Sequence, residues 1–204
     1  MIPPRSRISQ AIRRWRADED GSVAVETLMM VPLLAWAMLA TLSYFDAYRT
    51  EAISTKASLT LADMFSRETD WVDAAYIDGA ASLLGFLTIK DNNPQMRISV
   101  VKWEADDPVN QPLIGGYSVV WSHTRGGEKL PLTDLVIDDY TNQIPVMSHM
   151  ERIIVVETWT DYEAPYTIGL DDFTMQTFTV MSPRFASQLC YNPTPLLGAA
   201  TSVC

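Results

Sequence analysis

One apolar stretch near the N-terminus, VAVETLMMVPLLAWAMLATLSYF at residues 23–45, decides the fold. Apart from the phenol of Tyr44, its only ionisable side chain is that of Glu26. At about 1.5 Å rise per residue, a helix of this length crosses a hydrocarbon layer of about 30 Å. The stretch therefore predicts one transmembrane helix, which we place at residues 22–46.

The charge on either side of this stretch predicts its orientation. The whole chain of 204 residues has 25 Asp+Glu against 15 Lys+Arg, so its formal net charge is −10. Residues 1–21 nevertheless hold five arginines, and positive flanking segments stay in the cytoplasm. We expect residues 1–21 to be a cytoplasmic basic leader and residues 47–204 to be a periplasmic domain. An acidic domain of this kind is a poor ligand for nucleic acid.

Two other interpretations of the apolar stretch stay open. A cleavable secretory signal would use the small-x-small site Ala35-Trp36-Ala37, but the leader is long and contains acids, and apolar residues continue past the site. A buried core helix would ordinarily carry more polar positions over this length. Pro32 lies inside the stretch and removes the hydrogen bond to the carbonyl of Leu28, which predicts a kink near Leu28 and Met29.

The junction between the leader and the apolar stretch reads Gly21-Ser22-Val-Ala-Val-Glu26. If the bond between Gly21 and Ser22 is cut, Ser22 becomes the first residue and Glu26 the fifth. A glycine before the cut, a glutamate at the fifth mature position and a following apolar helix resemble the processing site of type IV pilins and pseudopilins. The resemblance implies a prepilin peptidase as a partner, with Gly21 and Ser22 as the processing residues.

Glu26 also has a physical explanation. A carboxylate inside the bilayer is unfavourable, by about 2.5–3.5 kcal/mol at a central position and less near the interface. The ammonium created at Ser22 by cleavage is a suitable partner, on the same helix or on a neighbouring subunit. Such a pair in low dielectric stabilises little but can fix the axial register of helices. We therefore assign assembly roles to Glu26 for registry and to Pro32 for the kink.

The resemblance narrows to the TadE-like minor pseudopilins of the tight-adherence (Flp, type IVc) pilus system. The segment from Gly21 to Leu34 resembles their N-terminal helix, and residues 152–165, RIIVVETWTDYEAP, are similar to a strand of those proteins. Thr27 after the glutamate and the small Ser22 depart from major pilins, which favours a minor subunit. The resemblance implies that the chain associates with other pilins and pseudopilins and with the assembly platform of the bacterial inner membrane, or enters a cell-surface pilus for adhesion and biofilm growth.

The rest of the chain predicts helices first and strands later, an α+β fold. Apolar residues at helical spacing continue the first helix to about residue 68 and then form a second, shorter helix. Four strands are expected at residues 97–105, 117–124, 152–162 and 173–181, with one short helix within 131–143. The fold we expect is a long N-terminal helix packed on a small antiparallel sheet of about four strands, similar to pilins. The second helix is indicated by Val72, Tyr76, Ala80, Leu83, Leu84 and Leu87, and the second strand by alternating Tyr117, Val119, Trp121 and His123.

The two cysteines, Cys190 and Cys204, lie close to the C-terminus. In an oxidising periplasm they can close a loop worth about 3 kcal/mol in the chain-entropy model. Free or intermolecular thiols are the alternative. A paired loop resembles the C-terminal disulfide loop of many type IV pilins, which implies a disulfide here.

The domain offers little that points to an enzyme, so we expect none and assign no catalytic residue, metal site or cofactor. His123 and His149 do not have zinc-ligand spacing, and no phosphate-binding or nucleophile motif occurs. The acid pairs Asp106-Asp107, Asp138-Asp139 and Asp171-Asp172 would suit calcium, but solvated acids in turns are commoner. An unprocessed single-pass membrane protein with a periplasmic sensing or scaffolding domain is the alternative function, and an anchored enzyme without a recognisable motif is a further one.

Overall fold

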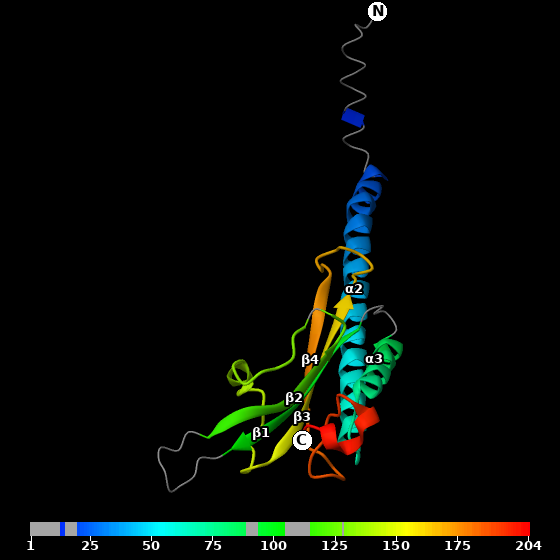
Figure 1. The fold of residues 1–204 in the computed structure, drawn as a ribbon. Coiled ribbons are helices and arrows are strands. Elements are labelled where there is room, and N and C mark those ends of the chain that lie inside the picture. The colour runs from blue at the N-terminus through cyan, green and yellow to red at the C-terminus, as the bar shows by residue number, and fades with distance from the viewer. Residues whose placement is uncertain (1–12, 15–19, 89–93, 105–114, 128) are drawn as a thin grey trace, which may run out of the picture. The chain divides into compact units, whose positions relative to one another are not determined.

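The computed structural model describes residues 13–14, 20–88, 94–104, 115–127 and 129–204. Most of the predicted leader, including Arg5, Arg7 and Arg16, lies outside the described residues, as do Asp106-Asp107. Among the described residues, the α-helical elements precede the four strands (Figure 1). The elements are α2 (Asp20–Ser66), α3 (Ala74–Thr88), β1 (Gln95–Glu104), β2 (Gly116–Arg125), η1 (Ile137–Tyr140), β3 (Arg152–Tyr162), β4 (Phe173–Met181) and η2 (Pro195–Thr201).

The chain divides into two compact units, and the first helix contributes to both. The first unit joins the N-terminal part of α2, up to Phe45, to the loop Ala164–Asp171. The second unit holds the rest of α2 and every other helix and strand.

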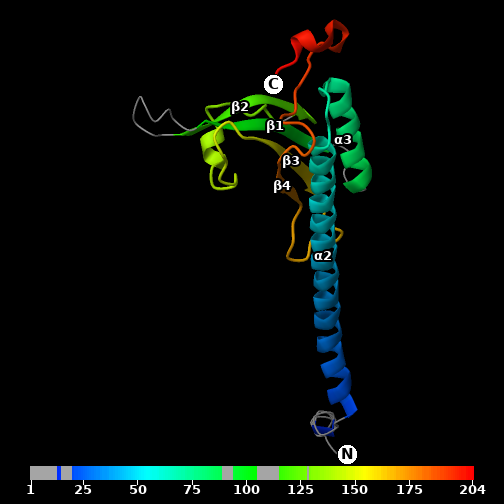
Figure 2. The same cartoon turned by 90° about the horizontal axis from the view of Figure 1, so that it is seen from below.

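The four strands form one antiparallel sheet in the order β2-β1-β3-β4. The predicted α+β fold, with a long N-terminal helix and about four antiparallel strands, is therefore confirmed. The predicted bounds of β3 and β4 agree with the structure, and those of β1 and β2 differ by one or two residues at each end. In the second unit, the C-terminal part of α2 and the helix α3 lie beside each other next to the sheet (Figure 2), and Asp78 of α3 forms an ion pair with Arg125 of β2.

The inner face of the sheet forms the main core with α2 and α3. This core is apolar towards the end of α2, where Leu61 and Phe65 are fully buried. Earlier on the helix the contacts are made by small hydroxyl side chains, since Ser54 bonds to Thr160 at 3.0 Å and Ser58 to Thr179 at 2.9 Å. Small residues allow the helix to approach the strands closely, and each of these four hydroxyls has a partner. The buried apolar residues of this core include Ala57, Leu61, Ala62, Phe65, Ile77, Leu84, Met96, Ile98, Val100, Ile154 and Val156.

The outer face of the sheet has a second, smaller core. Val101, Ile153 and Val155 project from β1 and β3 and pack under the segment between β2 and β3. That segment contains the short helix η1, which confirms the helix expected within residues 131–143, although it is a 3-10 helix of four residues. Burial on both faces explains why Ile153 to Val156 form a continuous apolar run instead of an alternation. The residues that cover this face are Leu132, Ile137, Ile144 and Met147.

The prediction that alternate residues of β2 share one face is wrong. Trp121 pairs with Val100, but Val119 pairs with the next residue, Val101, so Val120 is an extra residue in a β-bulge. A bulge places two residues opposite one and shifts the alternation beyond it. Trp121 and His123 therefore lie on the inner face, whereas Tyr117 and Val119 pack against the outer core.

The predicted start of the second helix also needs correction, because Val72 precedes it. The carboxylate of Asp73 accepts a hydrogen bond from the backbone N–H of Tyr76 at 2.8 Å, which is N-cap geometry, and α3 begins at Ala74. Val72 is instead buried beside Tyr191 in an isolated parallel bridge. The first helix ends at Ser66, two residues before the expected end.

Candidate functional site

The N-terminal part of α2 is the most unusual surface of the first unit, because it is both apolar and exposed. Leu28 is 75% exposed and Met29 is 71% exposed. Apolar patches on soluble monomers are rarely larger than a few hundred Å². Among the described residues, this is the only helix long and apolar enough to cross a membrane. The exposed apolar residues between Val23 and Leu42 are Val23, Val25, Leu28, Met29, Met30, Val31, Leu33, Leu34, Trp36, Met38 and Leu42.

The predicted processing residues lie at the start of this helix. Gly21 and Ser22 follow Asp20, the first residue of α2. Glu26 is exposed, and none of the described residues gives it a charged partner within 4.0 Å. The structure thus places the carboxylate of Glu26 one turn after Ser22, at the start of the exposed apolar part of α2. Cleavage of the chain and the kink at Pro32 remain predictions.

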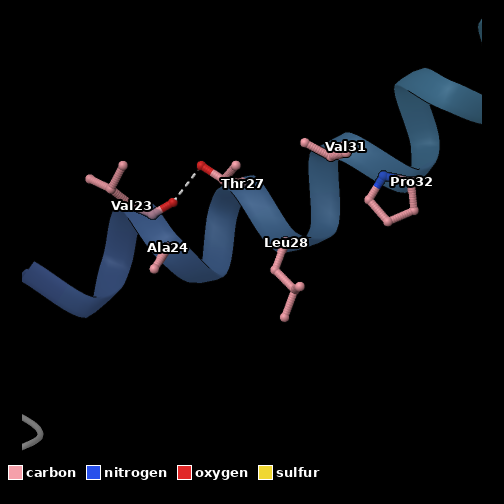
Figure 3. A pocket seen from close by; sticks show the side chains of 6 residues that line it. All are labelled: Val23, Ala24, Thr27, Leu28, Val31 and Pro32. Carbon is pink, nitrogen blue, oxygen red and sulfur yellow. Dashed lines mark hydrogen bonds between the residues drawn. The ribbon is translucent and has the colours of Figure 1, made fainter.

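A shallow apolar hollow follows directly on the same helix (Figure 3). Its volume is about 610 Å³, and Pro32 lies at one end of it. The hydroxyl of Thr27 donates to the carbonyl of Val23 at 2.8 Å, so this polar group is satisfied within the helix. The face is therefore suited to close packing against another apolar helix. The residues that line the hollow are Val23, Ala24, Thr27, Leu28, Val31 and Pro32.

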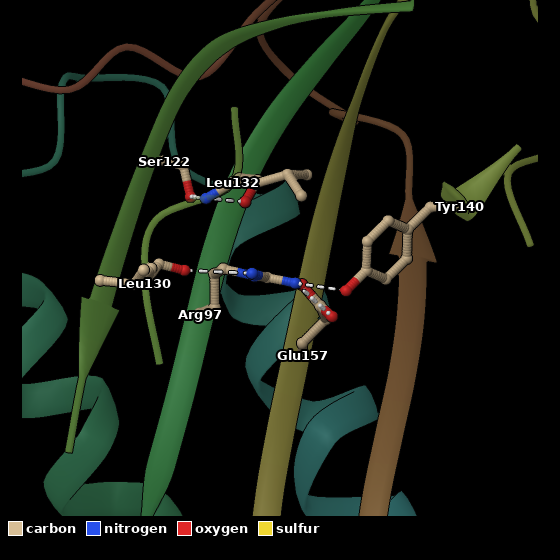
Figure 4. A network of polar contacts seen from close by, with 7 residues as sticks. Arg97, Ser122, Leu130, Leu132, Tyr140 and Glu157 are labelled. Atoms are coloured by element: carbon tan, nitrogen blue, oxygen red, sulfur yellow. Dashed lines mark hydrogen bonds and ion pairs between the residues drawn. The ribbon is translucent and has the colours of Figure 1, made fainter. Parts of the chain in front are cut away.

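The second unit contains a buried polar cluster that sequence reasoning missed. Arg97 of β1 donates to Glu157 of β3 through Nε at 2.5 Å and through Nη2 at 2.8 Å (Figure 4). It also donates to the carbonyl of Leu130 at 3.0 Å and to the hydroxyl of Tyr140 at 2.8 Å. Burial lowers the pKa of Arg97, but Glu157 and Tyr140 outweigh this effect and the pKa is raised. The available signal was a charged residue at the edge of a mainly apolar run in each of two predicted strands, with Arg97 before residues 98–101 and Glu157 after residues 153–156.

The polar cluster borders a hollow of about 620 Å³ on the outer side of the sheet. Lys129 lies over the ring of Trp159, 5.1 Å from its centroid, in a cation–π contact. The guanidinium of Arg97 already bonds to three partners, so it offers little to a ligand. We interpret the cluster as structural, because its hydrogen bonds connect β1, β3 and η1. The hollow is lined by Arg97, Lys129, Leu130, Pro131, Leu132, Thr133 and Val136.

The residues considered for metal binding do not come together. Across residues 13–14, 20–88, 94–104, 115–127 and 129–204, no group of three His, Cys, Asp or Glu side chains could hold a metal ion. His123 stacks on Tyr191, with ring centroids 5.2 Å apart. Asp138 and Asp139 belong to η1, and Asp171 and Asp172 lie at the end of the connection between β3 and β4.

The predicted disulfide is confirmed, since Cys190 and Cys204 are bonded with their Cα atoms 4.4 Å apart. The tail between them is held by the backbone of Tyr191, which exchanges two hydrogen bonds with Val203 at 2.9 and 2.7 Å. The N–H of Val72 in turn donates to the carbonyl of Cys190 at 2.9 Å. The disulfide therefore closes a C-terminal loop that is hydrogen-bonded to Val72, just before the start of α3.

In comparisons with known proteins, no family model matches the chain, and neither a curated protein nor a solved structure matches it.

Proposed function

We propose that this protein is a minor pseudopilin that takes part in the biogenesis of an adhesive Flp-type (type IVc) pilus. The observation that carries the proposal is the exposed apolar part of α2, whose one carboxylate, Glu26, follows the Gly21–Ser22 junction by one helical turn. In this function a prepilin peptidase of the inner membrane removes the cytoplasmic leader. The apolar segment then packs among the helices of other pilins and of the assembly platform, while the α+β domain lies in the periplasm.

Cleavage would supply the missing partner of Glu26. The new ammonium at Ser22 lies four residues earlier on the same helix, which corresponds to a rise of about 6 Å. The ammonium at Ser22 of a neighbouring subunit can also pair with Glu26, at an axial position that depends on how the two helices are aligned. Because an unpaired carboxylate in hydrocarbon is costly, only registers that bring one ammonium to each Glu26 are favoured.

The apolar hollow gives this function a packing face. Helices in lipid associate through close van der Waals contact and are favoured by small residues at the contact. Ala24 provides such a position, and Thr27 adds no unsatisfied donor because its hydroxyl bonds to Val23. The exposed face can therefore pack against a second helix without burying an unpaired polar group.

The first test is the N-terminal sequence of the mature protein in its native membrane. We expect it to begin at Ser22, and we expect Gly21→Val to leave the leader attached. A mature chain that begins at Met1 would contradict the proposal and support an unprocessed sensing or scaffolding protein. A chain that begins at Met38 would instead indicate ordinary signal cleavage.

The second test replaces the lone carboxylate. Glu26→Ala should leave membrane insertion intact and reduce pilus assembly at least about tenfold, which corresponds to about 1.4 kcal/mol. The matched control is Glu51→Ala, which removes an exposed acid from the same helix outside the apolar stretch. Pili would be counted by electron microscopy, and the protein would be quantified in membrane fractions. Normal piliation in Glu26→Ala would contradict the registry role.

A further inference from the structure

The loop between β3 and β4 belongs to the same compact unit as the apolar part of α2 and is bonded to it at two points. The hydroxyl of Ser43 donates to the carbonyl of Tyr166 at 3.3 Å, and the hydroxyl of Tyr44 donates to the carbonyl of Gly169 at 3.0 Å. Ser43 is fully buried. Within the loop, the N–H of Ile168 donates to the carbonyl of Tyr166 at 2.9 Å. These contacts attach the loop to the helix at Ser43 and Tyr44.

The point of attachment at Ser43 and Tyr44 coincides with the expected surface of a membrane. Val23 and Ser43 are 20 positions apart on α2, which corresponds to about 30 Å along the helix axis. The hydrocarbon core of a bilayer has about this thickness. A helix that enters the hydrocarbon at Val23 therefore leaves it where the loop is attached.

The composition of the loop fits this position. Residues 164–170 have no charged side chain, although Glu163 precedes them and Asp171 follows. Tyr166 is 47% exposed in spite of its aromatic ring, and Tyr44 and Phe45 on the helix are exposed as well. Aromatic side chains with a polar group are enriched where the hydrocarbon of a membrane meets its headgroups. The acids at both ends of the loop disfavour anionic lipids, so zwitterionic phospholipid is the better match.

We propose that the loop Ala164–Asp171 lies in the headgroup layer and binds zwitterionic phospholipid through Tyr166 and the neighbouring uncharged residues. It forms a second membrane contact of the chain, separate in sequence from the helix. This inference depends on the membrane insertion that is part of the proposed function. Lipid binding by the loop is independent of leader cleavage: the cleavage does not need it and does not produce it.

The test uses the full chain in phosphatidylcholine vesicles, with a fluorophore attached to Thr167→Cys. Both native cysteines are in the disulfide, so the introduced thiol is the one that reacts. Phospholipid that carries a nitroxide at a shallow acyl position should quench the label several-fold. Val146→Cys, at a fully exposed residue of the second unit, is the aqueous control and should not be quenched. Leu34→Cys, near the middle of the apolar helix, is the control for insertion and is measured with phospholipid that carries the nitroxide at a deep acyl position.

The outcomes separate the two proposals. Quenching at Thr167 and Leu34, but not at Val146, would support the lipid contact. Quenching at Leu34 alone would overturn the lipid contact of the loop but remain consistent with the membrane insertion of the helix. Without quenching at Leu34 the chain is not inserted, and both the lipid contact and the proposed function are refuted.

A second variant tests the attachment of the loop. Tyr44→Phe keeps the ring and removes the hydroxyl that donates to Gly169. The quenching at Thr167 should then fall towards the aqueous value, whereas Tyr48→Phe, at an exposed position of the same helix, should leave it unchanged. Equal quenching in Tyr44→Phe and the unsubstituted helix would show that this hydrogen bond does not hold the loop at the lipid surface.

Discussion

Phe45 and Phe65 belong to the same helix, α2, yet the first is 69% exposed and the second is fully buried. Both parts of the helix carry large apolar side chains, although the N-terminal part carries more of them, and the two parts differ in whether protein buries these side chains. From Ala57 to Phe65 the sheet and α3 supply it, whereas no described residue buries the apolar window near the N-terminus. Apolar residues on a helix therefore require a non-aqueous partner, but they do not specify whether protein or lipid provides it.

The largest expected effect comes from the same substitution made in both parts of the helix. Phe65→Ala should lower the free energy of unfolding by about 3–5 kcal/mol, because it leaves a cavity in the main core. Phe45→Ala should change it by less than about 0.5 kcal/mol, since the ring contacts little protein. Urea unfolding of the full chain in detergent micelles, followed by tryptophan fluorescence, measures both. Equal losses of unfolding free energy in the two variants would contradict the difference in burial between Phe65 and Phe45.

The contrast between buried and exposed positions should extend to charged side chains. Arg97→Leu leaves the fully buried Glu157 without its partner and should destabilise the protein by about 3 kcal/mol. Arg125→Leu removes a half-exposed ion pair with Asp78 and should cost less than about 1 kcal/mol. The same urea titration compares the two variants. A larger loss in Arg125→Leu would contradict the structural role assigned to the buried cluster.

The smallest expected effect is a pH dependence from His123 on the inner face. Burial, followed by the charge of Arg125, lowers the pKa of His123, and Asp78 opposes this shift. A pKa below the unfolded value of about 6.5 means that the contribution to stability is complete above about pH 6.5. It is lost as the pH falls through the folded pKa, because the unfolded chain then binds the proton more readily.

The variant for this effect is His123→Gln, compared with the unsubstituted chain. Urea unfolding between pH 5 and pH 7 should show a flatter pH dependence for His123→Gln. The same slope in the variant and in the unsubstituted chain would refute the contribution of His123.

Local patterns predicted many of the elements but not how they combine. The bounds of β3 and β4 followed from β-branched and aromatic runs, because such side chains pack well on a pleated surface. The start of α3 was misplaced at Val72, although Asp73 was available as an N-cap signal. Alternation in β2 failed because an extra residue, Val120, shifts the pattern, and a bulge depends on the pairing partner.

The buried ion pair shows the same limit for the candidate site. Arg97 and Glu157 are 60 positions apart, and they meet because β1 and β3 pair in a register that sets them directly opposite one another. Strand register depends on the hydrophobic pattern of both strands and on the connection between them, so neither strand predicts it alone. The apolar helix, its lone Glu26 and the cysteines were recognisable because each is a local property of composition.

The sequence by itself determined that one helix has enough apolar length to cross a membrane, that one carboxylate interrupts it, and that helices precede strands. Only the tertiary structure decided the order of the strands, the two cores on opposite faces of the sheet, the partner of Arg97 and the attachment of the loop Ala164–Asp171 to Ser43 and Tyr44. The reason is physical: helix length and hydrophobicity are summed along the chain, whereas register and burial depend on residues that are distant in sequence and meet only after folding.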